Sequence, residues 1–147
     1  MKILNKILLR RNLSTVPTGI YPLGSLRSAA IVLGQSGPCI EQARKFLSEN
    51  KLEGGVFVID SSCANKLLGR LKKSVREEIG NPDLLIVLSR DNSPYLNYMV
   101  RTSEAKFKIG LKPSVCDDAY DLVVDNSNDY FDEEIFKKIV EILKKIK

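Results

Sequence analysis

The feature that most constrains the fold is the stretch 82–112, in which a strand, a helix and a second strand follow one another closely. Residues 84–88 are apolar without alternation, which is typical of a strand covered on both faces and so of a parallel sheet flanked by helices. The second strand, over 105–111, has a period near two, with its apolar residues on one face and Lys106 and Lys108 on the other. The helix between them is predicted from four residues at helical spacing: Tyr95, Tyr98, Met99 and Thr102.

The segments around this stretch repeat the alternation of strands and helices. Further strands are predicted over 29–34, 56–60 and 122–125, and further helices over 38–50, 61–73 and 132–146. Strands separated by helical segments of this length favour βαβ units with right-handed crossovers. We therefore predict an α/β fold, a three-layer Rossmann-like domain with a mainly parallel sheet, preceded by a basic amphipathic N-terminal helix.

The chain divides into a short leading segment and one domain. Residues 1–26 are predicted to hold the basic amphipathic helix and an irregular connector with two prolines and two glycines, and residues 27–147 a single Rossmann-like α/β domain. No apolar run approaches the roughly 20 residues needed to span a bilayer. The three cysteines, Cys39, Cys63 and Cys116, are an odd number without CxxC spacing, so we expect free thiols and a cytoplasmic protein.

The absence of histidine excludes several chemistries. With no histidine among 147 residues, Ser-His-Asp and Cys-His catalysis and histidine-based metal sites are ruled out. Catalysis would have to use carboxylates, lysine, tyrosine or a thiolate. We predict no metal and no cofactor.

Small and acidic residues follow the predicted strands, where ligands bind in parallel α/β sheets. Gly34, Ser36 and Gly37 lie between the first strand and a helix; they favour a tight turn, with a weak anion site as the alternative. Asp60 and Asp91 follow the second and third strands and are either an acid-base pair in one crevice or ordinary helix caps. These five residues are the predicted ligand-binding set.

Two cysteines begin predicted helices, where the helix dipole would lower the thiol pKa. Neither Cys39 nor Cys63 has a neighbouring base in the sequence, so we interpret both as structural and unreactive.

Residues 1–12 carry both apolar and basic side chains at helical spacing. The basic side chains predicted to bind a partner are Lys2, Lys6, Arg10 and Arg11. Three interpretations stay open: packing on this domain or a second copy, an anionic membrane surface, and RNA or another partner. The same basic surface is predicted to continue over Arg90, Arg101, Lys106, Lys108 and Lys112.

The chain from about residue 28 to its end, most clearly over 83–112, resembles a bacterial domain family of unknown function with a Rossmann-like fold. The pattern Ala105-Lys106-Phe107-Lys108-Ile109-Gly110 is also distantly similar to the N-terminal domain of heptosyltransferase-type glycosyltransferases. That resemblance implies a second domain for a nucleotide-sugar donor, which we do not expect within these 147 residues, and an aspartate base where this chain has Pro38. It therefore implies the fold without the activity.

Two hypotheses about function follow. The first is a non-catalytic Rossmann-like binding or interaction module of unknown ligand, docked to a partner, a membrane face or a second copy through its basic N-terminal helix. The second is a small enzyme or half-enzyme, glycosyltransferase-like, that acts on a phosphorylated or sugar-bearing ligand at the strand ends.

Overall fold

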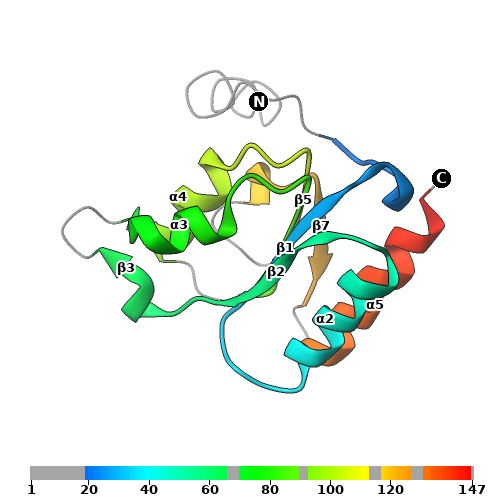
Figure 1. The fold of residues 1–147 in the computed structure, drawn as a ribbon, viewed down its shortest axis with the longest axis horizontal. Helices are drawn as coiled ribbons and strands as arrows, with labels where there is room; N and C mark the ends of the chain where they lie inside the picture. Colours follow the sequence, from blue (N-terminus) through cyan, green and yellow to red (C-terminus); the bar gives the residue numbers. More distant parts are fainter. Residues whose placement is uncertain (1–18, 66–69, 90–92, 113–116, 127–130, 147) are drawn as a thin grey trace.

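A parallel sheet forms the centre of the molecule. The computed structural model describes residues 19–65, 70–89, 93–112, 117–126 and 131–146. Five strands lie in the order β2-β1-β5-β6-β7, and every neighbouring pair is parallel (Figure 1). Their bounds are β1 (Ser28–Leu33), β2 (Glu53–Val58), β5 (Leu84–Val87), β6 (Phe107–Lys112) and β7 (Leu122–Asp125). The predicted α/β class and mainly parallel sheet are confirmed.

The central strands are buried on both faces. All of residues 84–87 in β5 are buried, as are residues 29–33 in β1. Alternate side chains enter two separate apolar clusters: Ile31 and Ile86 belong to one, and Val32 belongs to the other. We call these sides the first face and the second face. The unbroken apolar run therefore arises because each side of the sheet has its own core.

Two long helices cover the first face. They are α2 (Cys39–Glu49) and α5 (Asp132–Lys145), which lie side by side along the sheet (Figure 1). The rings of Phe46 and Phe136 meet edge to face with centroids 5.5 Å apart. The side-chain amide of Gln42 donates to the Glu133 carbonyl at 3.1 Å, which fixes the two helices near their N-termini.

The second face is covered by α3 (Lys73–Ile79) and α4 (Pro94–Thr102). The proline at the start of α4 suits the first helical turn, where no intrahelical donor is needed. Lys108 of β6 points to this face and is only 4% exposed. Its ammonium donates to the Val100 carbonyl at 2.8 Å, one of the last carbonyls of α4. The prediction that Lys108 belongs to a basic surface is therefore wrong, because its ammonium is buried and caps the C-terminal end of α4.

The predicted helix over 61–73 is wrong. Residues 61–63 form a 3-10 turn, and β3 (Ala64–Asn65) pairs with β4 (Arg70–Leu71) in an antiparallel hairpin. The amide of Lys72 donates to the Cys63 carbonyl at 2.8 Å and extends this pairing. Leu71 is buried in the second-face core, so tertiary packing overrides the local helical pattern. α3 follows in a stretch for which no element was predicted.

β2 begins three residues earlier than predicted, at a pair of glycines. Gly54 pairs with Ala29 in the parallel register and has a φ of +133°. A Cβ atom at this position would overlap the Ala29 carbonyl oxygen, so only glycine permits the approach of the two strands. Glycine is rare in strand interiors, which explains why the pattern misplaced this boundary.

The leading segment enters the domain through its last residues. The amide of Gly19 donates to the Lys106 carbonyl at 2.8 Å, and Tyr21 and Leu23 pack against the first-face core. The predicted N-terminal helix over 1–12 lies outside the described residues. Among the helices that are described, none is long and apolar enough to cross a bilayer.

Candidate functional site

The predicted ligand residues Gly34, Ser36 and Gly37 follow β1 at its carboxyl end. The chain passes from β1 to β2 on one side and then to β5 on the other, so the strand order reverses here, where such sheets bind ligands. A Cβ on Gly34 would lie 3.0 Å from the Ser89 hydroxyl oxygen, so the ends of β1 and β5 meet closely. Ser36 and Gly37 are exposed in the loop.

Asp60 follows β2 and is exposed. Its carboxylate accepts hydrogen bonds from the hydroxyl and the amide of Ser62, the amide at 2.9 Å, and so caps the 3-10 turn. The hydrogen bond from the Ser62 hydroxyl has the largest effect on the pKa of Asp60, followed by the one from the Ser62 amide. Both lower this pKa, which makes Asp60 a weaker base. The cap interpretation thus describes its observed contacts. Asp91, its predicted partner, lies outside the described residues.

The N-terminus of α2 is an unfavourable place for an anion. Cys39 opens this helix and is buried, and its thiol pKa is raised to about 12 by burial and by the nearby carboxylates of Asp132 and Glu133. The same two carboxylates oppose an anion bound at this helix end. Cys39 is thus held as a neutral thiol, as expected of a structural cysteine. Cys63 is a half-buried free thiol, and Cys116 lies outside the described residues.

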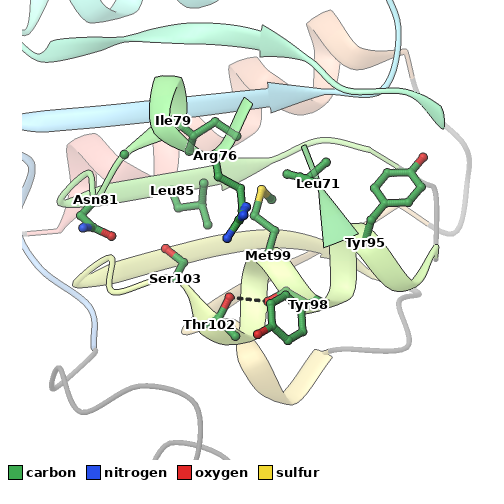
Figure 2. Close-up of a pocket in the computed structure, with 11 residues that line it drawn as sticks. Leu71, Arg76, Ile79, Asn81, Leu85, Tyr95, Tyr98, Met99, Thr102 and Ser103 are labelled. Atoms are coloured by element: carbon green, nitrogen blue, oxygen red, sulfur yellow. Dashed lines mark hydrogen bonds between the residues drawn. The ribbon is translucent and has the colours of Figure 1, made fainter. Parts of the chain in front are cut away.

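A cavity of about 150 Å³ lies on the second face, between α3 and α4. Leu71 of β4 and Leu85 of β5 form its buried floor (Figure 2), and Tyr95 of α4, which is also buried, lines its edge beyond Leu71. Its half-buried walls are made by Ile79, Tyr98, Met99, Thr102 and Ser103. Apolar and aromatic side chains therefore supply most of the contact surface, as in small-molecule sites.

Polar and charged groups gather at the exposed mouth of the cavity. Arg76 and Asn81 lie here, and the Arg76 guanidinium extends from α3 toward Met99 (Figure 2). Among the residues that the structure describes, no side-chain hydrogen bond or ion pair engages this guanidinium. Arg70 of β4 lies over the Tyr98 ring, 4.5 Å from its centroid, and stabilises that wall by a cation–π contact.

Thr102 and Ser103, which both carry hydroxyl groups, lie at the C-terminal end of α4. Thr102 donates to the Tyr98 carbonyl at 2.7 Å and so has its proton committed to the helix (Figure 2). The Ser103 hydroxyl oxygen accepts from the Ala105 amide at 3.2 Å, which leaves its own proton for another acceptor. Ser103 can therefore donate to a ligand oxygen.

The cavity is not where the sequence placed the ligand site. Gly80 and Asn81 precede β5, and Ser103 precedes β6, so the mouth lies toward the amino ends of these strands. None of the predicted residues Gly34, Ser36, Gly37 and Asp60 lines it. The sequence signal for this cavity was the helical spacing of Tyr95, Tyr98 and Met99, which we interpreted only as evidence for a helix.

No group of three or more metal-binding side chains occurs in the described ranges of the chain. The predicted partner-binding residues Lys2, Lys6, Arg10 and Arg11 lie outside those ranges.

Comparison with known families gives a match over residues 67–146 to the model described as a family of unknown function (DUF6913). The match spans β4 to α5 and so includes every residue that lines the cavity. No curated protein and no solved structure matches the chain.

Proposed function

This chain belongs to the family of unknown function DUF6913, and from its geometry we propose a non-catalytic small-molecule binding module. The proposed site is the cavity between α3 and α4. The sheet order supports a doubly wound, Rossmann-like description, since the five sheet strands run 2-1-3-4-5 when they are numbered among themselves.

The observation that carries this proposal is the combination of an apolar floor with an unengaged guanidinium at the mouth. A buried apolar cavity of about 150 Å³ is known to take a benzene-sized molecule in another protein, so this volume suits one ring or a branched chain. Typical drug-sized ligands need about 300 Å³ or more, which makes a nucleotide sugar too large for this cavity.

The side chains considered for catalysis support binding over reaction. Asp60 is committed to a cap and has a lowered pKa, while burial and nearby carboxylates keep Cys39 protonated. A general base works best with a pKa near the operating pH, and a nucleophilic cysteine needs its thiolate. Neither group meets its requirement.

The proposal is tested by titrating the ¹⁵N-labelled full chain with benzene, a probe of the apolar floor alone. We expect amide shifts at Ile79–Asn81 and Tyr98–Ser103, and their loss in Met99→Trp, whose larger ring would fill the cavity. Phe131→Trp is the matched control, because Phe131 is 75% exposed and lies outside the cavity. Unchanged wall amides at saturating benzene would overturn the proposal.

Docking through the N-terminal helix remains part of this proposal. The predicted basic residues of 1–12 would bring the module to a protein partner, a second copy, RNA or an anionic membrane face. The Gly19 amide donates to the Lys106 carbonyl, and this contact supports the proposal by attaching the chain to the domain just before β6.

The alternative is a small glycosyltransferase-like enzyme or half-enzyme with its ligand at the strand ends. Its supporting observation is the Gly34 loop at the point of strand reversal, closely packed on Ser89. Titration with a nucleotide sugar distinguishes the two hypotheses: the alternative expects amide shifts over 34–37, and the binding module expects none there.

A further inference from the structure

On the basis of the proposed function, we propose that the cavity binds a small monocarboxylate that carries one ring or one branched apolar group. The apolar part fills the space above Leu71 and Leu85, and the carboxylate pairs with Arg76 at the mouth. This inference names the ligand class of the cavity.

The size and lining of the cavity define the apolar part. Leu85 is fully buried and Leu71 is 3% exposed, and neither side chain carries a hydrogen-bonding group. Tyr95 and Met99 add an aromatic ring and a polarizable thioether, which both pack well on a flat ring. A volume of about 150 Å³ admits one six-membered ring and excludes a fused polycycle.

The guanidinium of Arg76 defines the charged part. It presents donors in a planar fork that matches the two oxygens of a carboxylate, and it extends over the cavity (Figure 2). No acidic side chain pairs with it among the residues that the structure describes. The Ser103 hydroxyl, with its proton available, supplies a further donor on the opposite wall.

The charges around the mouth favour a monoanion over a phosphate dianion. Arg70 lies against the Tyr98 ring, so Arg76 is the cation that extends into the cavity. One guanidinium balances one carboxylate, whereas the second charge of a phosphate dianion would have no further cation among the described residues that line the cavity.

The experiment compares benzoate with benzamide, which has nearly the same shape and no charge. Both are titrated into the ¹⁵N-labelled full chain, and the dissociation constants are taken from the wall amides 79–81 and 98–103. We expect benzoate to bind about tenfold more tightly than benzamide, since a hydrogen bond to a charged group is the stronger. Arg76→Gln should remove that preference, and Arg76→Lys should restore it only in part, because the fork is lost.

Arg44→Gln is the matched control. Arg44 is an exposed arginine of α2, on the first face, in an ion pair with Glu41 at 2.9 Å. Its replacement should leave the preference for benzoate unchanged. Equal affinity for the two probes, or a preference that survives Arg76→Gln, would overturn the carboxylate inference while benzene binding still upholds the proposed function. If none of the three probes, benzene, benzoate and benzamide, shifted the wall amides, both the carboxylate inference and the proposed function would be overturned.

Discussion

At the scale of single residues, the buried thiol of Cys39 makes the free energy of unfolding depend on pH. Burial and two carboxylates raise its pKa from 9.0 to about 12 in the folded protein. Between these values the folded state keeps a proton that the unfolded state loses, so the free energy of unfolding falls as pH rises from 9 toward 12. Urea unfolding at several pH values should therefore give a shallower decline for Cys39→Ala than for the parent chain. Parallel declines would contradict this assignment.

The ring of Tyr120 packs directly on Gly110 of β6. A Cβ atom at Gly110 would overlap that ring, and the strand and the ring are both buried. We expect Gly110→Ala to lower the free energy of unfolding by about 1–3 kcal/mol, the usual cost of overpacking. Gly37→Ala is the control: a Cβ there meets nothing within 4 Å, so denaturant unfolding should detect a change of at most about 0.5 kcal/mol.

The sequence predicted single residues well where periodicity alone determines the environment. Ile109 is buried on the first face as its spacing indicated. Lys108 was misplaced because alternation assigns a charged residue to solvent, whereas this lysine reaches a helix-end carbonyl across the second face. The partner comes from α4, and no local pattern encodes that contact.

At the scale of elements, β5 is the strand on which both cores depend. Ile86 is fully buried in the first-face core, with Leu85 in the second. Ile86→Asp would place an unpaired carboxylate in an apolar site, and we expect a loss of about 4 kcal/mol or more. Ile20→Asp makes the same chemical change at a side chain that is 56% exposed, and thermal unfolding should shift little. Similar melting temperatures for the two variants would refute the buried-strand assignment.

Elements with strong periodicity were predicted to within a few residues, and those set by long-range pairing were missed. β7 has the predicted bounds, and α5 ends one residue early. The hairpin of β3 and β4 depends on pairing between Ala64 and Leu71, and on burial of Leu71 against the second face. Its short strands carry no period of their own, so the segment resembled a helix.

At the scale of the whole molecule, the leading segment should be dispensable for folding. Gly19 is held to Lys106, and Tyr21 and Leu23 pack on the core, so the domain is anchored downstream of residue 12. We expect a chain that lacks residues 1–12 to melt within about 2 °C of the parent, because the contacts described for the core come from residues 19 onward. Its association with a second copy, anionic vesicles or RNA should be lost.

Salt separates the modes of association in the intact chain. Binding through the predicted basic residues should weaken steeply with added salt, whereas docking through apolar side chains should be nearly insensitive. Failure of the truncated chain to fold would show that residues 1–12 belong to the core.

The candidate site was the part of the molecule least accessible from sequence. The carboxyl ends of the strands could be located, because a parallel sheet brings them together. The cavity could not, since it requires α3, which was not predicted, and β4, which was predicted as helix. Arg76 acquires its place at the mouth only when α3 packs beside α4.

The most direct test of the account is a crystal structure of the full chain grown with benzoate. We predict density for the ring above Leu71 and Leu85, with the carboxylate within hydrogen-bonding distance of the Arg76 guanidinium. An empty cavity, or benzoate bound instead at the Gly34 loop, would contradict the claim that the space between α3 and α4 is the ligand site.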